Sequence, residues 1–154
     1  MRIINSLKRS NRNLFHKFYN AIFPVRSCIM PKGKVQKDEE REERIVMEAI
    51  VDAYGPEEQA MGWYYYLQDK ISFPFQGKCI LERKISPLKL KEVVEVISMA
   101  PEDECEREMF VVIRWMNREL AVPLVQLKGI KVNDETEEAI GDWHYWMEQG
   151  YEWG

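Results

Sequence analysis

The sequence predicts an α+β protein: N-terminal helices, a small SH3-like antiparallel β-barrel and a C-terminal helix. Three observations predict it. Apolar residues follow helical spacing up to about residue 70, follow a two-residue period after residue 75, and return to helical spacing after residue 133. With 154 residues and 45% hydrophobic content, the chain can form one domain with an ordinary core plus an extension.

The first helix of the acidic part of the chain is expected to follow the charge run KDEEREER at 37–44. Ile45 and Ala49 lie one helical turn apart and begin an apolar strip. Gly55 and Pro56 are expected to end this helix, because glycine readily forms a left-handed cap and proline cannot continue a helix.

A second helix is expected from Pro56 to about Lys70. Proline suits the first turn of a helix, and the carboxylates of Glu57 and Glu58 interact favourably with the N-terminal end of its dipole. The aromatic run at 63–66 (WYYY) is interpreted as core and interface residues rather than a ligand-binding box. Consecutive side chains on a helix point in several directions, which favours the core and interface interpretation over a single ligand-binding box.

Four or five short antiparallel strands are expected in the middle of the chain. The expected strands are 78–83, 93–98, 109–115, 118–122 and 125–130. A two-residue turn, Met116-Asn117, joins the third strand to the fourth, and Asn117 tolerates a positive φ there. So few strands cannot build a sandwich, but they can build a small, strongly bent barrel.

The last helix is expected to start at a cap formed by Asn133 or Asp134. Glu137 follows Asp134 at capping-box spacing. The apolar positions that would pack this helix onto the rest of the domain are Ile140, Trp143, Met147 and Tyr151.

Charge divides the chain into two parts. Residues 1–37 contain nine of the 22 basic residues and no acidic residue, whereas all 26 acidic residues lie in 38–154. The second part holds the other 13 basic residues, so its formal net charge is 13 − 26 = −13. An acidic domain at 38–154 attracts cations and repels nucleic acid, so nucleic acid is not an expected partner.

Residues 1–37 are expected to be a basic extension, either disordered or containing an amphipathic helix over about 1–23. One interpretation is a membrane-surface anchor, with apolar residues at the acyl boundary and cations at anionic headgroups. A targeting peptide is a second, because the segment lacks acidic residues. The third is an incidental upstream extension, with Met30 as the start of the functional protein.

The cysteines and histidines exclude several classes of site. Cys28, Cys79 and Cys105 are widely separated and form no C-x-x-C pair, which argues against a disulfide framework or a zinc site. A reducing, cytoplasmic compartment fits best. With only His16 and His144, and no phosphate-binding loop or nucleophile–base pair, an enzyme is not expected.

Five carboxylates crowd the segment 102–108 (EDECERE), between two expected strands. Their mutual repulsion is unfavourable unless water, Arg107 or a cation neutralises it. A hard divalent cation with oxygen ligands is the natural partner, and calcium tolerates irregular loops better than magnesium does. The competing interpretation is a solvated, solubilising turn.

Several long motifs of the acidic part resemble the cyanobacterial calcium-binding protein family known as CcbP. They lie at 51–70 (VDAYGPEEQAMGWYYYLQDK), 73–75 (FPF), 85–89 (ISPLK), 99–115 (MAPEDECEREMFVVIRW), 120–130 (LAVPLVQLKGI) and 139–146 (AIGDWHYW). The resemblance covers about 45–151. It implies a small cytoplasmic protein that binds two calcium ions outside any EF-hand and buffers or sequesters calcium, with a role in calcium signalling.

The resemblance also guides the choice of ligands. The expected metal ligands are Asp69, Glu102, Asp103, Glu104 and Glu106, followed by a second group of Asp52, Glu57 and Glu58. Asp69 is alternatively a surface residue facing Lys70, and helix-start electrostatics alone explain Glu57 and Glu58. Asp142 in the last helix is the weakest candidate.

A non-enzymatic calcium-binding protein is therefore the expected function. The alternative is a metal-independent protein–protein interaction module, since small barrels bind extended peptides in aromatic grooves. Residues 63–66 together with Trp115 would supply such a groove.

Overall fold

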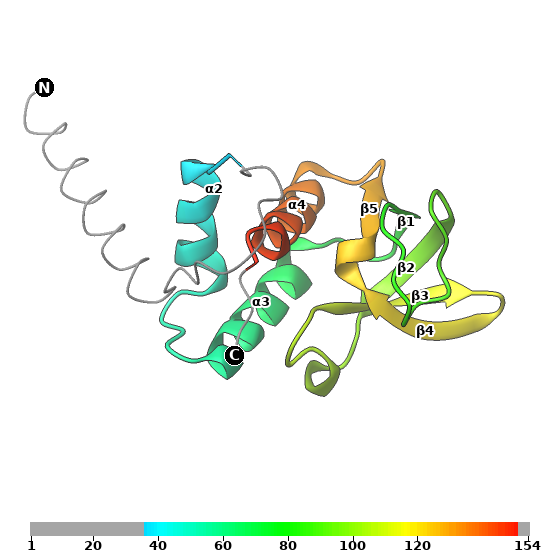
Figure 1. Ribbon diagram of the computed structural model, residues 1–154, viewed down its shortest axis with the longest axis horizontal. Coiled ribbons are helices and arrows are strands. Elements are labelled where there is room, and N and C mark those ends of the chain that lie inside the picture. Colours follow the sequence, from blue (N-terminus) through cyan, green and yellow to red (C-terminus); the bar gives the residue numbers. More distant parts are fainter. Residues whose placement is uncertain (1–35, 151–154) are drawn as a thin grey trace, which may run out of the picture. The chain divides into compact units, whose positions relative to one another are not determined.

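The computed structural model describes residues 36–150. The chain divides into two units, 1–43 and 44–154, and among the described residues the sheet and most of the helical residues belong to the second (Figure 1). The amphipathic helix expected at 1–23 lies outside the described residues, as does Tyr151. The domain boundary expected at residues 37 and 38 stays a prediction.

The helices are α2 (Glu39–Arg44), the π-helix η1 (Ile45–Ala49), α3 (Pro56–Lys70) and α4 (Asp134–Glu148). The charge run is thus itself helical, and the first helix ends at Ala49, earlier than expected. The amide of Ile50 donates to the carbonyl of Ile45, five residues back, in the wide turn that closes η1. The chain then leaves the helix well before Gly55.

The expectation of a left-handed cap at Gly55 is wrong. Gly55 has a φ of −128° and is the N-cap of α3, while the left-handed residue of this connection is Asp52, with a φ of 56°. The expected bounds of α3, from Pro56 to Lys70, are confirmed, with proline in the first turn.

Five strands form one antiparallel sheet in the order β4-β3-β2-β1-β5. They are β1 (Phe75–Cys79), β2 (Val93–Met99), β3 (Phe110–Trp115), β4 (Arg118–Pro123) and β5 (Leu127–Ile130). The α+β class is confirmed. Within the described residues the edge strands β4 and β5 do not pair, so the sheet is open and the expected closure into a barrel is not observed.

The first strand lies about three residues earlier than expected. Its buried face consists of Phe75, Gly77 and Cys79, whereas Ile80 and Leu81 are both exposed and continue no face. Gly77 weakens the strand pattern, yet a Cβ at this position would lie 3.2 Å from a methyl group of Val96 in β2. The close approach of β1 and β2 explains why the sequence pattern was misleading here.

The β3–β4 hairpin turns as expected. Met116 and Asn117 have φ values of 48° and 61°, the left-handed pair of a type I′ turn. In α4 the cap is Asn133, whose side-chain oxygen accepts the amide of Thr136 at 2.9 Å, so the candidate Asp134 is the first helical residue.

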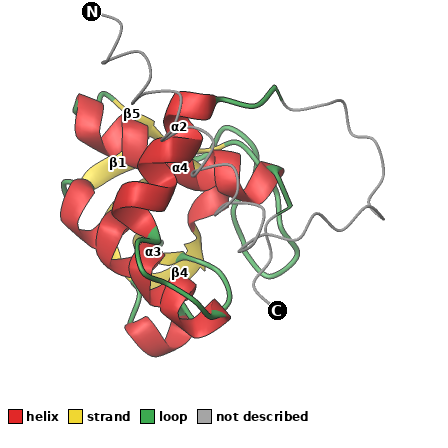
Figure 2. Ribbon diagram, turned by 90° about the vertical axis from the view of Figure 1, so that its left-hand side faces the viewer, coloured by secondary structure: helices red, strands yellow, loops and turns green. Residues whose placement is uncertain are grey.

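Helices α3 and α4 lie on one side of the sheet (Figure 2), and tryptophan rings pack between them. The ring of Trp63 lies 5.2 Å from that of Trp143 and 5.5 Å from that of Trp146, and all three residues are buried. Trp63, Tyr64 and Tyr66 are buried whereas Tyr65 is 55% exposed, which confirms the core interpretation of this run. No helix in the described part of the chain is long and apolar enough to cross a membrane.

Candidate metal site

The acidic segment connects β2 to β3 and contains a single 3-10 turn, η2 (Glu102–Glu104). Its anchor is Cys105, which is fully buried and whose sulfur accepts the amide of Phe110 at 3.5 Å. Burial raises the pKa of the Cys105 thiol, so the soft thiolate ligand is disfavoured. The loop therefore offers hard oxygen donors rather than sulfur.

Four of the five carboxylates in this loop face solvent. The exposed residues are Glu102, Asp103, Glu104 and Glu106. The fifth, Glu108, is already neutralised, because its two oxygens accept Nη1 and Nη2 of Arg83 at 2.9 and 3.2 Å. The negative charges of the four exposed side chains attract cations to the loop.

Two tyrosines of α3 attach the helix to this loop. The hydroxyl of Tyr64 donates to the carbonyl of Ala100 at 3.0 Å, and the hydroxyl of Tyr65 donates to Oε1 of Glu102. The bond to Glu102 raises the pKa of Tyr65 above its usual value, because the carboxylate stabilises the protonated phenol. The acidic loop is thus attached to α3 by one buried tyrosine, Tyr64, and one exposed tyrosine, Tyr65.

Asp69 lies one turn beyond Tyr65 on the same helix and is exposed. It lines a shallow pocket together with Glu48 of η1, and Oε2 of Glu48 lies 3.4 Å from Nζ of Lys70. Glu48 was not among the residues expected from the sequence. No local spacing could have indicated Glu48, because Asp69, with which it lines the pocket, lies 21 residues further along the chain.

The second group of candidates has a more local arrangement. Oε2 of Glu58 accepts the backbone amide of Tyr54 at 2.8 Å, so this side chain closes the start of α3. Glu57 is exposed in the same first turn, and Asp52 occupies the left-handed turn before it. The helix-start interpretation therefore accounts for Glu58, while ligand roles for Asp52 and Glu57 stay predictions.

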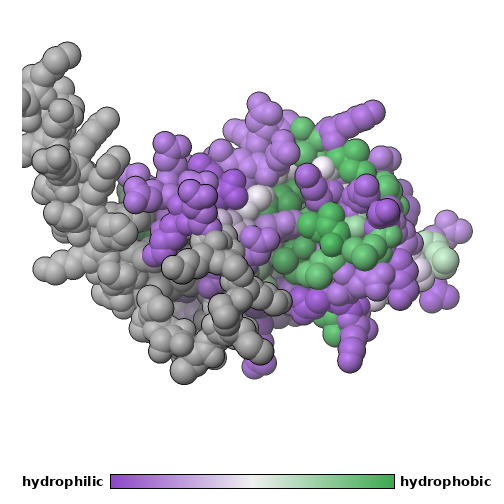
Figure 3. Space-filling view, turned by 45° about the horizontal axis from the view of Figure 1, so that its top comes forward, coloured by the Kyte–Doolittle hydropathy of each residue, from purple (hydrophilic) through white to green (hydrophobic). Residues whose placement is uncertain are grey.

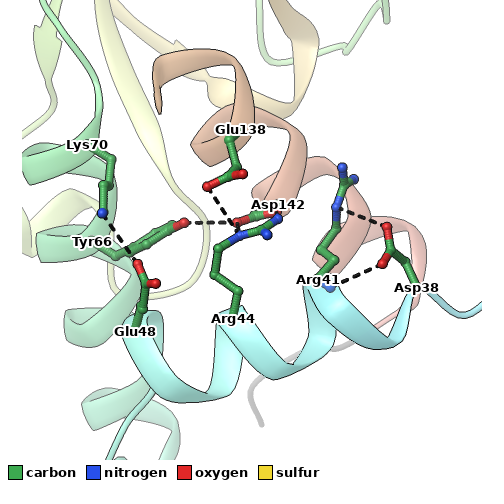
Figure 4. A network of polar contacts seen from close by, with 8 residues as sticks. All are labelled: Asp38, Arg41, Arg44, Glu48, Tyr66, Lys70, Glu138 and Asp142. Carbon is green, nitrogen blue, oxygen red and sulfur yellow. Dashed lines mark hydrogen bonds and ion pairs between the residues drawn. The ribbon is translucent and has the colours of Figure 1, made fainter. Parts of the chain in front are cut away.

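Asp142 is the centre of a buried ion pair (Figure 4). Nη2 and Nε of Arg44 donate to its two oxygens at 2.7 and 3.0 Å, and the hydroxyl of Tyr66 donates to Oδ2 at 2.8 Å. The hydrogen bond to Asp142 raises the pKa of Arg44, and burial together with Asp142 raises that of Tyr66. Both oxygens of Asp142 already accept hydrogen bonds from Arg44 and Tyr66, so Asp142 is unsuitable as a calcium ligand.

The donor set fits calcium by its chemistry, because calcium takes six to eight hard oxygen ligands at variable geometry. It is not preassembled: among residues 36–150, no three His, Cys, Asp or Glu side chains converge closely enough to hold a metal. Binding would have to draw the loop carboxylates together.

Comparison with known proteins supports the same class of site. A family model described as calcium binding, CcbP, matches residues 43–147. The crystal structure of Anabaena CcbP is 44% identical, with a TM-score of 0.69 over 77% of this chain and 98% of that one. A structure described as a calcium-binding protein in the calcium-binding form is 43% identical, with the same TM-score and coverage. No protein of curated function is a significant match.

The family model and the two solved structures show that this α+β protein is of the calcium-binding class. This chain belongs to one family of that class, the CcbP family of calcium-binding proteins.

Proposed function

We propose that this protein binds calcium through the acidic β2–β3 loop and acts as a cytoplasmic calcium buffer rather than an enzyme. The observation that carries the proposal is the set of four exposed carboxylates in a loop whose backbone is anchored by the buried Cys105 and by the Tyr65–Glu102 bond. Membership of a family described as calcium binding supports the identity of the ion.

The proposed ligands of the first ion are carboxylates of the loop. Glu102, Asp103, Glu104 and Glu106 offer up to eight carboxylate oxygens, the upper end of what calcium takes, and water fills each position that a carboxylate leaves open. Since these carboxylates do not converge without the ion, part of the binding energy is spent on ordering them. A moderate rather than very high affinity follows.

A second ion is proposed at the shallow pocket of α3. Asp69 and Glu48 supply carboxylates from two elements, and Lys70 must release Glu48 when the ion binds. Two separate acidic regions agree with a stoichiometry of two, and each is expected to titrate independently if the ions do not share a ligand.

The finer architecture proposed for the sheet is a partly open barrel of SH3-like type. β4 leads into β5 through one 3-10 turn, η3 (Leu124–Gln126), and β5 then pairs with β1 at the opposite edge of the sheet. This order brings the two ends of the meander toward each other without closing the ladder.

Calorimetric titration of chelator-treated protein in excess magnesium tests the function. We expect saturable calcium binding and a higher thermal midpoint with calcium, because a ligand of the folded state stabilises it. The loop variant Glu102→Gln/Asp103→Asn should lose one binding event, and Asp69→Asn should weaken the other.

The matched control is Glu119→Gln/Glu135→Gln, which removes the same charge from exposed positions outside the loop. It should bind calcium as the wild type does. Absence of saturable binding below about 1 mM, the weak end for protein calcium sites, contradicts the function. An equal loss of calcium binding in the loop and control variants contradicts the assignment of the site to the loop.

A further inference from the structure

The segment 78–93, which contains the β1–β2 loop, is basic in an otherwise acidic domain. It holds Lys78, Arg83, Lys84, Lys89 and Lys91, five of the 13 basic residues in 38–154, and only two acidic residues. Its charge is therefore 5 − 2 = +3, against −13 for 38–154 as a whole. A positive segment on a cation-binding domain needs a partner other than calcium.

Both acidic residues of this segment are used to hold its backbone. Oε1 of Glu82 accepts the amide of Leu90 at 3.1 Å. The carboxylate of Glu92 accepts the amide of Lys89 and Nε1 of Trp115, each at 3.0 Å. These hydrogen bonds of the two carboxylates thus go to amide and indole donors, and Glu92 also interacts with a lysine charge, that of Lys89.

Four lysines remain available. Lys78, Lys84, Lys89 and Lys91 are exposed, and in the described part of the chain none of them forms an ion pair. Arg83 is different, because Glu108 engages it in two hydrogen bonds. That pair also neutralises Glu108 of the acidic loop.

Large aliphatic side chains are exposed between these lysines. The exposed residues are Ile80 (44%), Leu81 (44%), Ile85 (65%), Leu90 (56%) and Val93 (50%). Figure 3 shows apolar surface bordered by hydrophilic residues on the part of the molecule that carries the sheet. The loop is also anchored, because Leu88 is fully buried and the amide of Ser86 bonds to the carbonyl of Arg83.

We propose that residues 80–92 dock on an anionic lipid surface. Ile85 and Leu90 enter the boundary of the acyl chains, and Lys84, Lys89 and Lys91 remain at the headgroups, since lysine keeps its ammonium in the polar layer while its stem lies along apolar material. The loop and the lipid surface are thus complementary in charge and in polarity, and hydrogen bonds within the loop hold its shape.

A lipid surface suits exposed aliphatic side chains that alternate with lysines, because both the acyl boundary and the anionic headgroups then have a partner. The pocket at Glu48 and Asp69 and the pocket at Ser72 and Asn133 are both lined by residues outside 80–92, so neither of them offers a peptide a groove on this loop. Attraction between lysines and anionic headgroups is screened by salt. The interaction is therefore expected to be reversible and salt-sensitive.

Hydrogen exchange of the full chain on vesicles tests the proposal, with chelator present so that calcium cannot bridge carboxylates to lipid. The vesicles are phosphatidylcholine with and without phosphatidylglycerol. We expect slower amide exchange within 80–92 on the anionic vesicles and not on the neutral ones. This reading is local, so binding by the basic residues 1–37 alone cannot produce it.

Cosedimentation of variants gives the second readout. Lys84→Ala/Lys89→Ala should weaken partitioning roughly thirtyfold, at about fivefold for each lysine near the surface. Ile85→Ser/Leu90→Ser should weaken it with charge unchanged. The control Arg107→Ala/Lys131→Ala removes two exposed charges elsewhere and should partition as the wild type does.

Unchanged exchange at 80–92 in vesicle-bound protein overturns the proposal, as does failure to bind anionic vesicles. Equal weakening by the control variant overturns it too, because general charge would then explain the binding. Protection of 80–92 by polyglutamate but not by vesicles would identify an acidic protein as the partner instead. None of these outcomes depends on calcium binding.

Discussion

The hydroxyl of Tyr65 donates a hydrogen bond to Oε1 of Glu102 and so ties α3 to the acidic loop. The two residues lie 37 positions apart, and both are exposed. A neighbour that orients a ligand carboxylate commonly changes metal affinity without touching the metal. Tyr65 is therefore the positioning residue of the proposed calcium site.

Replacing Tyr65 tests that relationship. Tyr65→Phe should weaken calcium binding about tenfold, because Glu102 loses the donor that orients it. Competition with a calcium indicator measures the effect. Tyr54→Phe, at a more exposed tyrosine, is the control and should leave the affinity unchanged. An unaltered affinity in Tyr65→Phe would remove Tyr65 from the site.

The buried pair of Arg44 and Asp142 predicts a large loss of stability. Arg44→Ala should lower the free energy of unfolding by about 3–5 kcal/mol, because it leaves a fully buried carboxylate without its cation. Chemical denaturation measures the difference. Arg118→Ala, at an exposed position, should cost less than about 0.5 kcal/mol. Similar values for both variants would contradict the structural role of the pair.

The raised pKa of Tyr66 predicts a loss of stability in alkali. An unfolded tyrosine releases its proton near pH 10, whereas the folded one holds it to higher pH because of burial and of Asp142. The unfolded state then binds fewer protons, so the contribution of Tyr66 is complete below about pH 10 and falls as the pH rises further.

Denaturation from pH 9 to 11.5 checks this direction. Tyr66→Phe should show a shallower decline than the wild type, and Tyr54→Phe should decline as steeply as the wild type does. A steeper decline in Tyr66→Phe would reverse the sign and contradict the assignment. (These pH limits bracket the ordinary tyrosine pKa of about 10.)

Gly62 permits the close contact of η1 with α3. A Cβ at this position would lie 2.3 Å from the carbonyl oxygen of Ala49, which is backbone and cannot move aside cheaply. Gly62→Ala should lower the free energy of unfolding by about 1–3 kcal/mol despite the better helix propensity of alanine. At Gly55 a Cβ meets nothing within 4 Å, so Gly55→Ala should cost less than about 1 kcal/mol. A stabilised Gly62→Ala would contradict the contact.

Local patterns were sufficient for most elements. The bounds of α3 follow from Pro56 and the charged residues around it, and the type I′ turn follows from two residues at a hairpin tip. The error at the first strand arose because Gly77 looks like a weak strand residue. A Cβ there would crowd a methyl group of Val96, which comes from another strand and cannot be identified from local sequence.

The candidate site divides in the same way. Its charge was visible in the sequence, since five carboxylates within 102–108 repel one another unless something neutralises them. The sequence did not show that Glu108 pairs with Arg83 or that Asp142 pairs with Arg44, because each partner is distant in sequence. Whether the four remaining loop carboxylates and Asp69 bind calcium stays a prediction.

The sequence by itself determined the α+β class, the family and the acidic loop, because periodicity, motifs and charge are properties of neighbouring residues. Tertiary structure decided which carboxylates are already paired, which tyrosine meets the loop and where Glu48 lies. These depend on contacts between segments such as α3 and the 100–109 loop, and only the packing of the helices against the sheet brings such segments together.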